Sequence, residues 1–274
     1  MGFKTPRVAR LLASAAIVAT LGAAVAGCKT FGGDDTTGSI ASASAPMTPR
    51  SEEDWRRSLD VWGAKYKQDP NDIEAALRYA QALRATEQRA QAVAVLEQAS
   101  IRNPRDMALL GAYGRALAEA GDLNQALDVL SRAHTPDNPN WRVLNAQGAV
   151  LDQLGRHVEA QRHYSTALKI VPDEPAILSN LGLSYALTKD LKRAEVTLRR
   201  ALEHPESNPK VRQNLALVIG LQGRIPEAER NARAGLSDQE AAANVSYLKQ
   251  MIAQQSEWKK PGRKPRLPAP NTDG

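Results

Sequence analysis

The sequence predicts an all-α protein in which about five two-helix units stack into a solenoid, and three observations support this. The first is a 34-residue repeat, visible because small residues recur at that spacing. The second is that only 4% of the residues are aromatic, which suits helices packed through Ala and Leu. The third is that Gly and Pro recur where the helices of such a unit would end. Five such units run from about Ile73 to Ala242.

Small residues occupy three places of the unit when Trp141 is counted as place one. Two helices cross closely only where their side chains are small, so these places predict contacts between helices. Place eight has Ala80, Gly114, Gly148, Gly182 and Ala216, place twenty has Ala92, Ala126, Ala160, Ala194 and Ala228, and place twenty-seven has Ala99, Ala133, Ala167, Ala201 and Gly235. Larger apolar residues at places eleven and twenty-four fill the space between them. Place fifteen has Gly121, Gly155 and Gly223, which predict helix ends with left-handed backbone.

One further helix is predicted on each side of the five units, so that the solenoid covers residues 51–256. A capping box at Ser51 starts the first of these helices, and Trp55, Leu59, Trp62 and Tyr66 follow at helical spacing. The two Trp side chains are expected to pack in the core; contact with a ligand is the alternative. A second capping box starts at position 237 and precedes three apolar residues on one helical face, Val245, Leu248 and Ile252. Helices of this kind shield the two ends of a solenoid.

The N-terminal end of the chain predicts attachment to a membrane. Residues 1–27 combine a positive start with an apolar run too short to span a bilayer comfortably, as in a signal peptide. Val25-Ala26-Gly27-Cys28 resembles the bacterial lipobox, which implies cleavage before Cys28 and its acylation. An ordinary signal peptide followed by an incidental Cys is the alternative. Lys29 favours the outer membrane, because Asp there signals inner-membrane retention in enterobacterial lipoproteins.

The segments that flank the solenoid are low in apolar periodicity. Residues 28–50 are rich in Gly, Ser, Thr and Ala and are expected to form a flexible tether. Residues 257–274 are expected to form a disordered, basic, Pro-rich tail. Residues 1–27 and residues 257–274 each have a net charge of +3, which accounts for the formal net charge of +6, so the central region is close to neutral. This distribution argues against nucleic-acid binding.

No combination of residues predicts catalysis, so we expect that the chain is not an enzyme. The four His residues lack metal-ligand spacing, and the sequence contains no HExxH, GxSxG or Gly-rich phosphate loop. We therefore expect no metal, no cofactor and no small-molecule substrate.

The unit resembles the tetratricopeptide repeat, whose helix hairpins stack into a right-handed α-solenoid. The small residues match this family, whereas its aromatic residue at place four is absent, and the fifth unit has Arg212 there. In this family the first helix of each unit lines a concave groove through places two, five, nine, twelve and thirteen. The resemblance therefore implies a partner-binding groove that is polar in the early units and apolar in the late ones. Its predicted residues are Arg84, Arg115, Arg142, Asn145, Leu183, Leu187, Leu217 and Leu221. Two arrangements of the leucines stay open: they form an open trough, or the helix through Val245 folds over them.

A lipobox, a Ser/Thr/Gly-rich tether and about five tetratricopeptide units together resemble the TadD lipoproteins of tight-adherence (Tad/Flp) pilus assembly. The resemblance implies a periplasmic scaffold, anchored by lipid to the outer membrane, that helps to assemble or locate the pilus secretin. Its protein partner would be the secretin or another Tad component. The alternatives are a lipoprotein of the outer-membrane β-barrel assembly machinery and a regulator of peptidoglycan synthesis.

Overall fold

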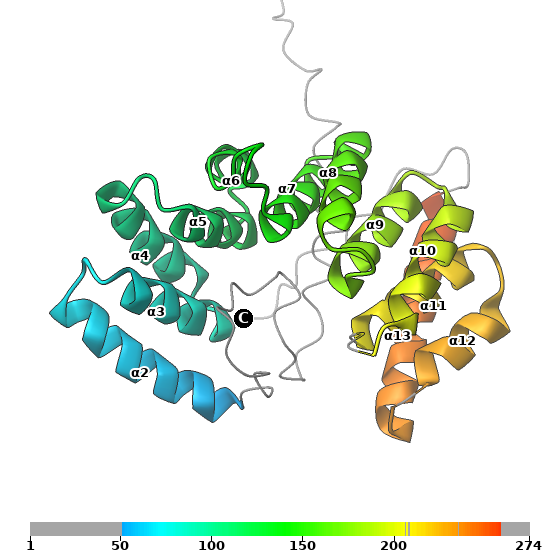
Figure 1. The fold of residues 1–274 in the computed structure, drawn as a ribbon. Helices are drawn as coiled ribbons and strands as arrows, with labels where there is room; N and C mark the ends of the chain where they lie inside the picture. The colour runs from blue at the N-terminus through cyan, green and yellow to red at the C-terminus, as the bar shows by residue number, and fades with distance from the viewer. Residues whose placement is uncertain (1–50, 206, 208, 235, 259–274) are drawn as a thin grey trace, which may run out of the picture.

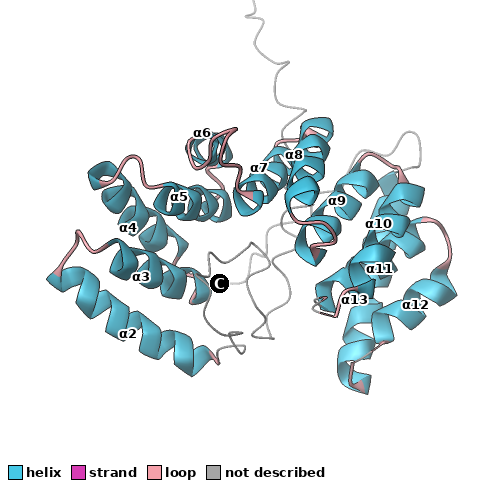
Figure 2. Cartoon of the chain, in the orientation of Figure 1, coloured by secondary structure: helices cyan, strands magenta, loops and turns pink. Residues whose placement is uncertain are grey.

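The computed structural model describes residues 51–258 except 206, 208 and 235, and the regular structure of these residues is helical (Figures 1 and 2). The helices are α2 (Glu52–Gln68), α3 (Ile73–Ala85), α4 (Arg89–Arg102), α5 (Met107–Ala120), α6 (Leu123–Ser131), α7 (Trp141–Gln153), α8 (His157–Ile170), α9 (Pro175–Leu187), α10 (Leu191–Glu203), α11 (Pro209–Leu221), α12 (Ile225–Arg233) and α13 (Asp238–Trp258). The predicted all-α class is confirmed. The predictions for the signal peptide, Cys28, the tether and the tail from residue 259 lie outside the described residues.

The 34-residue period of the sequence is also the period of the helices. First helices begin at Ile73, Met107, Trp141, Pro175 and Pro209, and second helices begin at Arg89, Leu123, His157, Leu191 and Ile225. The described residues thus form five hairpins, which confirms the predicted solenoid. In Figure 1 the hairpins follow one another along an arch, with first helices such as α5 and α7 toward its inner side and second helices such as α6 and α8 toward its outer side.

The small residues hold the two helices of each unit together. All five Ala residues at place twenty have 0% of their surface exposed. At place eight, a Cβ added to Gly114 would lie 2.5 Å from Leu130 of place twenty-four, and one added to Gly148 would lie 2.5 Å from Tyr164. The large residue at place twenty-four therefore fills the notch that the small residue at place eight leaves. This close fit explains why the repeat needs a small residue at place eight and, opposite the glycines, a large one at place twenty-four.

The ends of the helices are also set by the repeat. The residue before each first helix caps it with a side-chain oxygen in four units, at Asp72, Asp106, Asn140 and Glu174. The three Gly residues at place fifteen have left-handed backbone, with φ of 94°, 77° and 87°. Glu87 and Lys189 occupy the same place in the first and fourth units, and their φ values of 61° and 66° are also left-handed.

The two predicted end helices are present. In α2, Ser51 and Asp54 form the predicted capping box, and Leu59 and Tyr66 pack against the core of the early units. At the other end, Val245 and Leu248 of α13 are each 5% exposed and belong to the core of the late units. Helix α13 reaches Trp258, two residues past the predicted solenoid end at 256. Among the described residues, no helix is long and apolar enough to cross a membrane.

Candidate functional site

The predicted binding residues all lie on first helices, which line the inner side of the arch (Figure 1). We use "inner face" for places two, five, nine, twelve and thirteen of α3, α5, α7, α9 and α11. Each first helix also packs beside the first helix of the next unit. A polar residue on the inner face can therefore bind a neighbouring helix rather than a ligand.

Arg84 on α3 is bound within the protein. Its guanidinium donates from Nε to Oε2 of Glu119 on α5 at 2.7 Å, and from its terminal nitrogen to Oε1 at 2.5 Å. The Arg84 side chain is only 9% exposed, and that of Glu119 is 29% exposed. This two-bond geometry makes a strong contact between the first and second units. Arg84 thus stabilises the solenoid, and little of it is accessible to a partner.

Asn145 on α7 has a similar role. It is 2% exposed, and its Oδ1 accepts a hydrogen bond from Asn180 of α9 at 3.0 Å. One unit later, Asn214 of α11 donates to Ser179 of α9 at 3.0 Å. Asn180 and Asn214 were not predicted as structural residues, although their spacing of 34 in the sequence was the signal that could have identified them.

The other two predicted arginines are also buried or half-buried. Arg115 on α5 is 5% exposed. Arg142 on α7 is half-buried, and its guanidinium carbon lies 4.3 Å from the ring centroid of Trp141. This distance is that of a cation–π contact. The three predicted arginines of the early units therefore offer little accessible charge to a partner.

The four predicted leucines on α9 and α11 differ in their surroundings. Leu187 is 36% exposed, and Leu183 and Leu221 are half-buried. Leu217 is half-buried and packs against the core cluster that contains Val245 and Leu248 of α13. Leu187 presents the most open apolar surface of the four. The inner face of the late units is therefore a partly exposed apolar surface.

A carboxylate that is only 12% exposed lies where the third and fourth units meet. Asp152 of α7 accepts hydrogen bonds from Nδ1 of His157 at 2.8 Å, from the hydroxyl of Tyr164 at 3.0 Å and from Oγ of Ser184 at 2.8 Å. Burial raises the pKa of Asp152 above its ordinary value, and the three donors oppose that change. In a catalytic triad the serine would contact the histidine, but here both contact the same carboxylate. The arrangement joins two units and lacks the geometry that activates a nucleophile.

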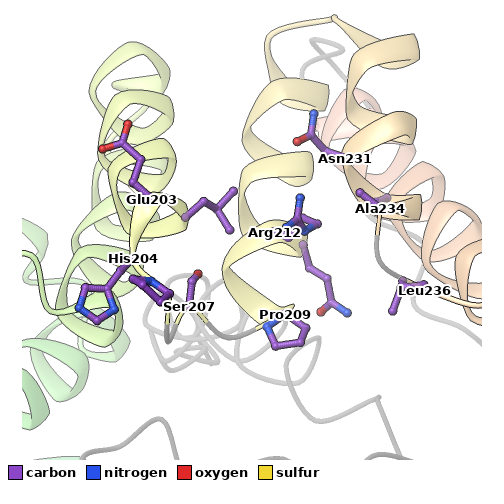
Figure 3. Close-up of a pocket in the computed structure, with 12 residues that line it drawn as sticks. Glu203, His204, Ser207, Pro209, Arg212, Asn231, Ala234 and Leu236 are labelled. Carbon is purple, nitrogen blue, oxygen red and sulfur yellow. The ribbon is translucent and has the colours of Figure 1, made fainter.

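A pocket of about 390 Å³ lies beside the connection between α10 and α11 (Figure 3). Its walls include Ser207, Arg212 of α11, and Asn231 and Ala234 near the end of α12. Arg212 stands at place four, where the family's aromatic is missing, and this pocket was not predicted. Among the described residues, no group of three or more His, Cys, Asp or Glu side chains is arranged to hold a metal ion. The expectations of no metal and no cofactor stay predictions.

Comparison with known families supports the interpretation of the repeat. The family model described as tetratricopeptide repeat matches residues 77–140 and 145–209, which include most of the first four hairpins. The fold is that of a tetratricopeptide-repeat protein. None of the curated proteins compared with this chain matches its sequence.

Solved structures of tetratricopeptide-repeat proteins have a similar fold. A thermophilic tetratricopeptide protein of Thermus thermophilus is 23% identical, with a TM-score of 0.58 over 65% of this chain and 98% of that one. PilW, a widely conserved type IV pilus biogenesis factor, is 17% identical, with a TM-score of 0.59 over 73% of this chain and 91% of its own. Cut9–Hcn1 of the APC/C is 15% identical, with a TM-score of 0.61 over 74% of this chain and 40% of that one. At these identities the likeness shows the fold alone.

Proposed function

We propose that this chain is a lipid-anchored periplasmic scaffold that binds a protein partner through the inner face of its late units. The observation that carries the proposal is the repeated pair of leucines on α9 and α11. Leu183 and Leu187 recur 34 residues later as Leu217 and Leu221, so they form one stripe across two neighbouring helices. A stripe of this kind fits an amphipathic helix whose apolar anchors are spaced by three and four residues.

The cellular role that we propose is assembly or location of the secretin in a Tad-type pilus at the outer membrane. Cys28 after Val25-Ala26-Gly27 supports the lipid anchor, and the Ser/Thr/Gly-rich segment to residue 50 supports a tether. The likeness to PilW supports the use of such a solenoid beside a pilus, although PilW is described as a type IV pilus factor. A scaffold of this kind needs no catalytic group, since it acts by holding its partners close together.

The binding surface is tested with Leu183→Asp combined with Leu187→Asp. A bound apolar helix would remove water from the two introduced aspartates, which is unfavourable. Capture of the secretin by the purified chain should therefore fall at least tenfold. The melting temperature should fall by only a few degrees, because Leu187 is exposed to water and Leu183 is only half-buried.

The matched control is Val158→Asp combined with Val196→Asp. These valines are 61% and 69% exposed and lie on second helices, toward the outer side of the arch. This control should bind the secretin as the parent does. Equal loss of binding in both double variants, or none in either, would contradict the proposed surface.

The anchor is tested separately with Cys28→Ser. If Cys28 is acylated, the variant should lose lipid labelling and leave the membrane fraction, because the acyl chains supply the stable attachment. A variant that stays with the outer membrane would overturn the lipoprotein part of the proposal and leave the binding surface untouched.

A further inference from the structure

Helix α2 carries the register of a second helix, and none of the described residues covers the face that such a helix buries. In the five complete units, place twenty is fully buried, and place twenty-four is at most 4% exposed. In α2 these places are Ser58 and Trp62, and both are only half-buried. They line a shallow depression of about 300 Å³ together with Asp54, Arg57 and Val61. By register, a first helix that covered them would begin at residue 39, in a stretch where the sequence has Pro46 and Pro49.

The exposed face of α2 is self-complementary. Asp54, Ser58, Val61 and Lys65 are spaced by four, three and four residues, so they share one face of the helix. The set is symmetric about the point between positions 59 and 60. An antiparallel second copy of the helix would place Asp54 opposite Lys65 and Ser58 opposite Val61. The match uses both charge and shape, because a small residue meets a larger apolar one.

The charges along α2 favour the same orientation. Its first turn is acidic, with Glu52, Glu53 and Asp54, and its last turn contains Lys65 and Lys67. The Arg57 guanidinium and Ser51 hold the pKa of Asp54 at about 2, so this carboxylate is charged at any ordinary pH. Lys65 is held near the same face, with its Nζ 4.3 Å from the ring centroid of Trp62. A parallel pair would instead bring the two acidic turns together.

We propose that the occupant of this face is a second copy of the chain, with two α2 helices packed antiparallel about a two-fold axis. This interface is isologous, since the same patch serves both subunits. It buries Val61, now 54% exposed, and the open side of Trp62 in each copy. Leu59 and Tyr66 stay against the protein's own core. The inference does not rest on the proposed function.

The expected affinity is modest. Two short helices bury less than the roughly 1,600 Å² of a standard protein interface, so the dimer should form in the micromolar range in solution. Two chains held on one membrane would have a much higher effective concentration, and the same contact would then be largely formed.

The first test is sedimentation equilibrium of the full-length chain in detergent at concentrations up to about 100 µM. The parent should show a monomer–dimer equilibrium, and Val61→Lys should weaken it at least tenfold by placing a charge at the centre of the interface. Val158→Lys and Val196→Lys are the controls, because these valines are similarly exposed on other helices; both should dimerise like the parent. Thermal melting of Val61→Lys should match the parent at concentrations low enough for the parent to be monomeric, which shows that the variant is folded. A parent that stays monomeric, as it would if the chain's own N-terminal segment or another protein covered α2, overturns the proposal.

The second test measures the register. Chains with Ser58→Cys are mixed with chains with Val61→Cys, each in a Cys28→Ser background so that no other thiol is present. Mild oxidation should link the mixed pair faster than either variant alone, because the antiparallel axis brings position 58 of one copy to position 61 of the other. Lys67→Cys, on a different face of α2, should not cross-link. Equal cross-linking at 67, or faster linkage within a single variant, would overturn the antiparallel register.

Discussion

The same register position has opposite roles in the two halves of the solenoid. Place thirteen is Glu119 in the second unit and Leu187 in the fourth. Glu119 is bound by the guanidinium of Arg84 on the preceding first helix, whereas Leu187 is 36% exposed. Asn145 and Asn180 add a polar contact between the third and fourth units, and Asn214 and Ser179 add one between the fourth and fifth. The difference between the halves therefore lies in the charged pair of the early inner face and in the partly exposed leucines of the late inner face, which leave apolar surface available for a partner.

This difference changes the meaning of a polar residue in the predicted groove. A charged side chain there can bind a ligand or the next first helix, and only its exposure distinguishes the two. Arg84 and Arg115 are nearly inaccessible, so the early units are a poor second choice for the binding site. The late units remain the better candidate, because their leucines carry no charge for a neighbouring helix to bind and Leu187 is exposed to water.

The largest effect is expected from Glu119→Ala. The substitution leaves the buried Arg84 guanidinium without its carboxylate, so the free energy of unfolding should fall by about 2 kcal/mol or more. Leu187→Ala changes the same place in the fourth unit and should cost under about 0.5 kcal/mol, because that side chain is already partly exposed. Urea unfolding followed by circular dichroism measures both. Similar losses in the two variants would show that the halves do not differ as described.

A smaller effect is expected from pH, and it should arise in the early half. His163 of α8 is half-buried; burial lowers its pKa below the ordinary 6.5, and nearby His134 adds to this. The unfolded chain therefore binds a proton more readily than the folded chain. The stability that depends on a neutral His163 is fully present above pH 6.5 and is lost as the pH falls below 6.5.

The variant His163→Gln cannot acquire this charge, so its stability should fall less than that of the parent between pH 7 and pH 5. Urea unfolding at constant ionic strength measures the difference. Hydrogen exchange at both pH values should place the extra opening of the parent in α6 to α8. An identical pH dependence in parent and variant would assign the loss to other groups.

The sequence predicted the helices well because their determinants are local. A small residue at place eight, Ala at place twenty and a cap before each first helix act within one unit, so a fixed spacing reveals them. The inner face was predicted less well, since its character depends on pairs between units. Nothing in Arg84 or Asn145 alone shows that Glu119 or Asn180 will bind it. The core cluster against which Leu217 packs includes residues of α13, so its composition depends in the same way on how the last helix docks.

The smallest effect compares the two halves at a place where they should behave alike. Place fifteen has left-handed backbone in all five units, but it is Glu87 in the first and Lys189 in the fourth. This conformation costs a residue with a Cβ about 1–2 kcal/mol, so replacing that residue by Gly should stabilise the folded state. Part of this stabilisation is offset because Gly makes the unfolded chain more flexible. Glu87→Gly and Lys189→Gly should therefore each raise the free energy of unfolding by about 0.5–1 kcal/mol. Glu87 also has an exposed contact of 3.9 Å with Arg89, worth little, so Lys189→Gly should gain at least as much. Gly155→Ala is the reverse control and should destabilise by a similar amount. Suppose that Lys189→Gly stabilises the protein and Glu87→Gly does not. If Arg89→Ala does not reproduce this difference in the free energy of unfolding, the two halves differ in their turns as well as on their inner faces.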